Sequence, residues 1–90
     1  MEERRIFKYK LKMKDTQEKA MSIGAEILCV QTQFEKPCIW ALINPKVKGI
    51  EDRHFRIYGT GHTINYTNLK YIGTFQLDGG NYVFHLYECI

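Results

Sequence analysis

Short segments of strand-forming residues, separated by turn residues every eight to twelve positions, constrain the fold of this chain more than any other feature. The clearest turn is Asp-Gly-Gly-Asn at residues 78–81, because glycine readily adopts the positive φ that tight hairpin turns require. No segment shows a long helical periodicity. The spacing therefore predicts an all-β, mainly antiparallel fold of six or seven short strands in a small sandwich, barrel or curved sheet.

Six segments have the composition of β-strands, and a seventh is ambiguous. Branched and aromatic residues predict strands at residues 5–13, 25–34, 38–43, 54–58, 71–77 and 82–88. Residues 15–18 have the Asp-x-x-Glu form of a helix capping box, but residues 17–21 also fit a short strand. The apolar run at 38–43, which includes Trp40, predicts a central strand covered on both faces. Polar stretches predict a turn at 35–37 and loops at 44–53 and 63–69.

A chain of 90 residues that is 44% hydrophobic and 26% charged has the composition of one small soluble domain, residues 1–90. It contains no run of about 18 apolar residues, so we expect no membrane-spanning helix and no membrane partner. The charged start at residues 1–5 is not followed by the apolar segment of a secretory signal.

The cysteines and histidines give no sign of a disulfide framework or a metal site. An odd number of cysteines without a Cys-x-x-Cys motif favours buried, reduced thiols in the cytoplasm. The cysteines are Cys29, Cys38 and Cys89. The histidines are equally scattered and form no zinc-binding pattern, so we expect neither a metal nor another cofactor.

The excess positive charge lies at the N-terminus. Residues 1–14 contain six Lys or Arg and two Glu, whereas the other residues contain seven Lys or Arg and eight Asp or Glu. Strict alternation here predicts that Phe7, Tyr9, Leu11 and Met13 face inward along a strand. The lysines then form one row facing water, which comprises Lys8, Lys10, Lys12 and Lys14. Such a row either contacts nucleic-acid phosphates or an acidic protein, or protects an edge strand from aggregation.

The segment 56–62 has the composition of a ligand-binding loop. It comprises Arg56, Ile57, Tyr58, Gly59, Thr60, Gly61 and His62. Glycines allow backbone N–H groups to converge on a phosphate, nucleotide or carboxylate, and Arg56 or His62 can balance its charge. Alternatively, the two glycines only mark a bulge or the end of a strand.

Nothing in the sequence predicts catalysis. Catalysis requires a nucleophile with its base, or a pair of titratable groups in perturbed environments, and neither stands out here. We therefore expect no enzyme. His85, in the middle of a predicted strand, is expected to be a partly buried, hydrogen-bonded core residue.

Several segments resemble one known family. These are residues 24–30, 38–45, 54–64 with Gly-Thr-Gly-His, 71–76 with Tyr-Ile-Gly-Thr-Phe-Gln, and 83–88. They resemble uncharacterised small proteins carried by bacteriophages, prophages and plasmids, and the resemblance covers nearly the whole chain. In that family the segment matching 17–24 looks like a strand and turn, so we prefer a strand at 17–21. The family has no established activity, so the resemblance implies a genomic context and no site residues.

That context leads to three expected functions. The first is a non-enzymatic accessory protein, in the cytoplasm of a bacterial host, that binds and modulates or inhibits a host or antiphage-defence protein, as anti-CRISPR proteins do. A free strand edge and aromatic-rich strands suit such binding. The second is a small-molecule or nucleotide-binding protein that sequesters a signal through residues 56–62. The third is a weak nucleic-acid binder that uses the lysine row. Assembly into a homodimer stays open.

Overall fold

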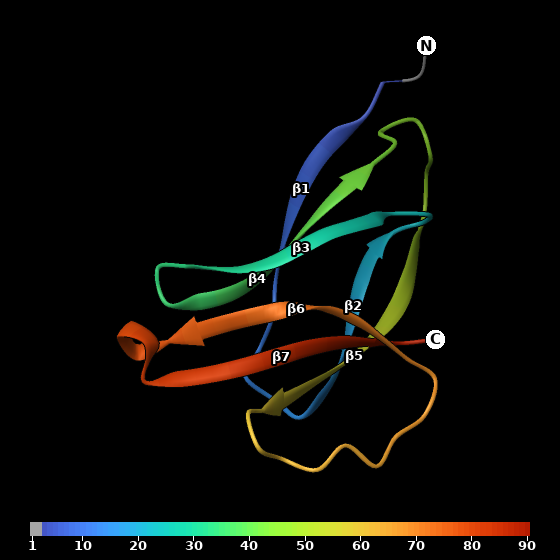
Figure 1. The fold of residues 1–90 in the computed structure, drawn as a ribbon. Helices are drawn as coiled ribbons and strands as arrows, with labels where there is room; N and C mark the ends of the chain where they lie inside the picture. Colours follow the sequence, from blue (N-terminus) through green and yellow to red (C-terminus); the bar gives the residue numbers. More distant parts are fainter. Residues whose placement is uncertain (1–2) are drawn as a thin grey trace.

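The computed structural model describes residues 3–90 and consists of seven strands in two antiparallel sheets (Figure 1). The strands are β1 Arg5–Lys10, β2 Thr16–Ser22, β3 Glu26–Gln33, β4 Lys36–Ile43, β5 Ile50–Gly59, β6 Leu69–Leu77 and β7 Tyr82–Cys89. A three-stranded sheet has the order β1-β4-β3, and a four-stranded sheet has the order β2-β5-β7-β6. The predicted all-β, antiparallel class is confirmed, and residues 16–22 form a strand rather than a helical turn.

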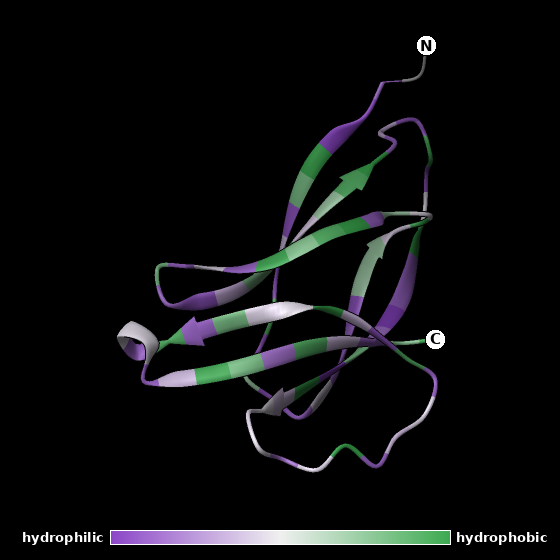
Figure 2. Cartoon of the chain, viewed as in Figure 1, coloured by the Kyte–Doolittle hydropathy of each residue, from purple (hydrophilic) through white to green (hydrophobic). Residues whose placement is uncertain are grey.

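Three connections pass from one sheet to the other. They lead from β1 into β2, from β2 into β3, and from β4 through residues 44–49 into β5 (Figure 1). Hydrophobic and hydrophilic residues alternate along several strands (Figure 2). Because successive side chains point to opposite faces of a sheet, this alternation places apolar side chains on one face. The buried core comprises Leu11, Met21, Ala25, Val30, Ile39, Ala41, Ile43, Phe55, Ile57, Phe75 and Leu86.

The sheets approach each other most closely where β3 meets β6. A Cβ atom added at Gly73 of β6 would lie 2.9 Å from the Cγ1 atom of Val30, which is buried in β3. A side chain at that crossing would force Val30 to shift, so glycine suits the close approach of the two sheets. β4 is the central strand of its sheet, as its apolar sequence predicts, although the outer side chain of Trp40 is only half-buried.

The N-terminal strand is shorter than predicted, because β1 ends at Lys10 rather than at residue 13. The side chain of Gln17 accepts a hydrogen bond from the N–H of Lys12 at 2.9 Å and donates one to its carbonyl oxygen at 2.6 Å. These bonds replace strand pairing and turn the chain toward β2. The prediction that these apolar residues all face inward is therefore wrong for Met13, which is 45% exposed. Phe7 is also nearly half exposed.

Two predicted connections are also wrong in position. The turn predicted at 35–37 lies at residues 34–35, and Pro37 is the second residue of β4. Proline is tolerated at this position because the pairing of β4 with β1 extends only as far as Cys38, the residue that follows Pro37. The missing N–H of Pro37 therefore costs the ladder few hydrogen bonds. The loop predicted at 44–53 ends at residue 49, because the polar residues that follow pair with β2 in a ladder exposed to water.

The last hairpin is confirmed. β6 and β7 pair from Leu69↔Cys89 to Leu77↔Tyr82, and a single 3-10 turn at Asp78–Gly80 connects them. Gly79 and Gly80 have positive φ angles of 64° and 97°, as the sequence of this turn predicts. No element within residues 3–90 is a helix of the length and apolarity needed to cross a membrane.

Candidate functional site

β5 carries two arginines three residues apart, and the alternation of a strand places them on opposite faces of the sheet. Arg53 faces inward and forms a bidentate ion pair with Glu88 of β7, with N···O distances of 2.6 and 2.9 Å. Its Nη1 donates a third bond, of 2.5 Å, to the carbonyl oxygen of Ala25. The hydrogen bond to Glu88 raises the pKa of Arg53, although burial acts in the opposite direction. The cluster connects β5 and β7 to the turn before β3, so its role is structural.

Arg56 faces outward and has a different environment. Its guanidinium carbon lies 3.9 Å from the centre of the Tyr66 ring. No carboxylate pairs with Arg56 among residues 3–90. Desolvation lowers the pKa of Arg56, but hydrogen bonds and charge interactions with Tyr58 and Cys89 outweigh it, so the pKa is raised. Arg56 is therefore a permanent cation held between a ring, a phenol and a thiol.

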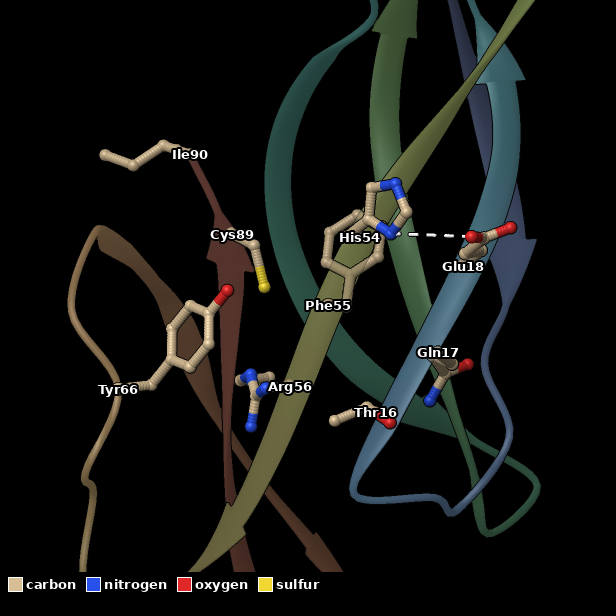
Figure 3. Close-up of a pocket in the computed structure, with 9 residues that line it drawn as sticks. All are labelled: Thr16, Gln17, Glu18, His54, Phe55, Arg56, Tyr66, Cys89 and Ile90. Atoms are coloured by element: carbon tan, nitrogen blue, oxygen red, sulfur yellow. Dashed lines mark ion pairs between the residues drawn. The ribbon is translucent and has the colours of Figure 1, made fainter.

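Two hollows meet at Arg56. The larger has a volume of about 630 Å³ (Figure 3). Its lining residues are Thr16, Gln17, Glu18, His54, Phe55, Arg56, Tyr66, Cys89 and Ile90. The smaller hollow, of about 230 Å³, is lined by Arg56, Tyr58, Thr63, Asn65 and Tyr66. The carboxylate in the larger hollow, Glu18, lies 3.7 Å from His54 Nδ1 on the side away from Tyr66 (Figure 3).

The structure places Arg56 and Tyr58 of the predicted loop on this same outer face, but Ile57 points into the core, and the contacts differ from those predicted. Tyr58 packs edge-on against Tyr87, with ring centres 5.8 Å apart. The N–H of Thr60 donates to the carbonyl oxygen of Val83 at 3.2 Å, and the N–H of His62 donates to that of Gly59 at 3.1 Å. Those two amides are therefore engaged in backbone bonds and do not converge on a common point. Gly61 has a φ of 89°, which fits the turn that these bonds close.

A chain of hydrogen bonds that the sequence did not indicate runs across the same face. Thr60 Oγ1 lies 2.8 Å from His85 Nε2, and His85 Nδ1 lies 2.8 Å from Thr74 Oγ1. Thr74 Oγ1 is in turn 2.5 Å from the hydroxyl of Tyr71. His85 is half-buried and hydrogen-bonded, as predicted, but it lies on the outer face rather than in the core. Residues from three separate segments meet here only through strand register, so spacing alone could not reveal the chain.

The predicted lysine row does not form a single row. Lys8 lies on β1 and donates to the Oε1 of Gln33 at 2.6 Å across the sheet, whereas Lys12 and Lys14 lie beyond the end of the strand. Lys10, Lys12 and Lys14 line a hollow of about 160 Å³, and its other lining residues are Thr16, Gln17, Glu18 and Lys19. β1 is an edge strand of its sheet, which agrees with the protective interpretation of its lysines. Nucleic-acid binding by these residues stays a prediction.

The tip of the β3–β4 hairpin carries a second unusual feature. Phe34 and Glu35 form a two-residue turn in which both have positive φ, 51° and 62°, the signature of a type I′ turn. Asparagine and glycine are the residues that favour this conformation. Phe34 is nevertheless 89% exposed, the largest exposure among the large hydrophobic residues of the described chain. The sequence analysis missed it because neither residue at 34–35 is a turn former.

The comparisons with known proteins place the chain in a family. A family model described as "Domain of unknown function (DUF7352)" matches residues 2–90. The chain belongs to that family. No curated protein and no solved structure matches it. Membership of the DUF7352 family agrees with the resemblance to an uncharacterised family and assigns no activity, so functional arguments depend on the surfaces described above.

Those surfaces offer binding chemistry rather than a metal centre. Within residues 3–90, no group of three or more His, Cys, Asp or Glu side chains is placed to hold a metal ion. The cysteines of this DUF7352 chain are free, with Cys38 buried and Cys29 and Cys89 half-buried. The functional arguments below use the Phe34 tip and Arg56, which forms no ion pair within residues 3–90.

Proposed function

We propose that this DUF7352 protein is a non-enzymatic binding protein that docks on a partner protein through the tip of its β3–β4 hairpin. Phe34 is the anchor and enters an apolar pocket of the partner. The observation that carries the proposal is an aromatic side chain that is 89% exposed at a φ of 51°.

Two costs make Phe34 a poor choice for the fold alone. The left-handed conformation costs about 1–2 kcal/mol for a residue that has a Cβ atom. An exposed phenylalanine also forgoes about 1.5–3 kcal/mol that burial of its ring would contribute. A partner that buries the ring recovers the second contribution, whereas asparagine at the same position would reduce the first cost and avoid the second.

The surroundings of Phe34 resemble those of an interface hot spot. A hot spot is an aromatic or arginine anchor surrounded by polar groups that exclude water. Here Gln33, Glu35 and Lys36 flank the ring along the hairpin. The two-residue turn is short and is fixed by the Gln33↔Lys36 pair, so little conformational entropy is lost when it binds.

The resemblance to proteins of bacteriophages, prophages and plasmids supports a partner in the bacterial cytoplasm, either a host protein or a component of antiphage defence. Binding to such a protein would modulate or inhibit it without chemistry of its own. This is the first of the three functions expected from the sequence. It needs no cofactor and no residue of the Arg56 face.

The test compares two substitutions of exposed apolar residues in tagged full-length chains isolated from a host bacterium. Phe34→Asn removes the anchor and relieves the backbone. It should raise the free energy of unfolding by about 0.5–1 kcal/mol while reducing co-purification of the stoichiometric partner at least tenfold. At this chain length, 1 kcal/mol corresponds to a rise in Tm of roughly 4–8 °C.

Ile50→Asn is the matched control, because Ile50 is 69% exposed and lies at the start of β5, away from the hairpin tip (Figure 1). Ile50→Asn should leave the amount of partner that co-purifies with the tagged chain unchanged. Equal recovery with Phe34→Asn and wild type would contradict the proposal. Equal losses with both variants would do so too, because they would indicate non-specific adhesion of apolar surface.

A further inference from the structure

We propose that the outer face of β5 binds a nucleotide of low charge, with its phosphate on Arg56 and its base on the free face of Tyr66. This site is separate from the hairpin tip, and its ligand is a small molecule rather than a protein. It requires neither the Phe34 anchor nor a partner protein.

The first argument is the lack of a counter-charge. Arg53, on the same strand, uses its guanidinium on Glu88 and a carbonyl oxygen. Arg56 interacts instead with a ring, a phenol and a thiol. A guanidinium offers five donors in a planar fork that matches phosphate, and no carboxylate of residues 3–90 forms an ion pair with this one.

The second argument is preorganisation. Tyr66 covers one face of the Arg56 guanidinium at 3.9 Å, and Figure 3 shows the arginine between Tyr66 and Thr16. Because stacking leaves the edges of the guanidinium open, the donors that Tyr58 and Cys89 do not engage remain available to both adjoining hollows. A long side chain that is already held in place loses less entropy when it binds.

The third argument concerns the class of ligand. Tyr66 is 48% exposed, so the ring face opposite Arg56 is available to stack on a base. The hollow of about 630 Å³ lies within the range of about 300–1,000 Å³ typical of small-molecule sites. Thr16 adds a hydroxyl on its other wall, and the smaller hollow adds Thr63 and Asn65. These groups suit hydrogen bonds to a sugar or to the edge of a base.

Charge limits the ligand further. Among the described residues, Arg56 is the only Lys or Arg side chain that lines either hollow, and the larger hollow also contains the carboxylate of Glu18. One cation near one carboxylate favours a single phosphate group and disfavours a triphosphate, whose additional charges would be unpaired. We therefore expect nucleoside monophosphates or cyclic nucleotides rather than triphosphates.

The test is an NMR titration of the full-length 15N-labelled chain with adenosine and guanosine 5′-monophosphates, their cyclic forms and triphosphates, and inorganic phosphate. At least one monophosphate or cyclic nucleotide should shift the amide signals of residues 54–58, 63–66 and 89–90. It should bind at least tenfold more tightly than inorganic phosphate, because phosphate alone lacks the stacking contact.

The variants assign the contacts. Arg56→Gln should weaken binding by about tenfold or more, and Tyr66→Leu should abolish the advantage over inorganic phosphate. Lys46→Gln removes one exposed positive charge in the connection at 44–49 and should leave affinity unchanged. The proposal is overturned if no nucleotide shifts these signals at millimolar concentration, if Arg56→Gln binds as the wild type does, or if a triphosphate binds best.

Discussion

The two arginines of β5 have the same chemistry, lie three positions apart, and have opposite roles. Arg53 meets a carboxylate, a carbonyl oxygen and a low-dielectric environment, with 17% of its side chain exposed. Arg56 meets a tyrosine ring beside open hollows. The difference teaches that residue type alone does not decide the role of an arginine. An arginine whose charge is paired with a carboxylate holds the fold together, whereas one without such a pair is available to a ligand.

The sharpest test of this comparison is to remove one partner of the inner pair, which is the ion pair between Arg53 and Glu88. Glu88→Gln leaves the Arg53 charge partly buried without its counter-ion, and should lower the free energy of unfolding by about 3 kcal/mol in urea titrations. The double variant Arg53→Met, Glu88→Leu removes both charges and should recover much of that loss. A loss below 0.5 kcal/mol (roughly the effect of an ordinary surface substitution) would mean that the inner pair is not structural.

Two glycines extend the comparison from charge to packing, because an added Cβ atom would come within 2.9 Å of a neighbour at each. At Gly73 the neighbour is Val30, buried where the sheets cross, so Gly73→Ala should cost about 1–3 kcal/mol. At Gly59 the neighbour is the exposed ring of His62, which can move aside, so Gly59→Ala should cost less than about 1 kcal/mol. Chemical denaturation of both variants measures the difference, and equal costs would contradict it.

The smallest effect belongs to the outer arginine. Arg56→Gln removes a charge that makes no ion pair within residues 3–90, so the free energy of unfolding should change no more than it does for an ordinary surface substitution. The same urea titrations measure it. A loss comparable to that of Glu88→Gln would show that the stack on Tyr66 is part of the scaffold, and the contrast between the two arginines would fail.

The ion pair between Arg53 and Glu88 determines how the contribution of Arg53 to stability depends on pH. The hydrogen bond to Glu88 raises the pKa of Arg53 in the folded state, so the stability from this arginine is present throughout the neutral range. As the pH rises, it is lost only when the folded-state pKa is passed, at strongly alkaline pH. Measurements of the free energy of unfolding between neutral and mildly alkaline pH should accordingly show no loss of stability attributable to Arg53.

The sequence predicts the strands well where local signals agree with the fold. Alternation, apolar runs and the glycines at 79–80 indicate the number of strands and the last hairpin correctly. Prediction fails where tertiary structure overrides local signals. Pro37 suggests a turn but continues a strand, and polar residues at the start of β5 suggest a loop because that ladder faces water.

The candidate sites were less accessible to sequence reasoning for a similar reason. Glu88 has the sequence signature of a surface carboxylate, and only the register of β5 with β7 brings it to the inner arginine. The contact of Tyr66 with Arg56 depends on how the connection between β5 and β6 folds back over the sheet. Phe34 lacks any turn signal, so its exposure became visible only with its backbone angles.

The most direct test of the central claim, that Phe34 is a docking anchor, is site-specific photocrosslinking in living cells. The substitution Phe34→p-benzoyl-phenylalanine places a photoreactive ring at the hairpin tip, and the same substitution at Ile50 serves as the control. The account predicts one dominant adduct of constant mass with a single partner protein from position 34, and none from position 50. The absence of any adduct from position 34, or the same adducts from both positions, would contradict it.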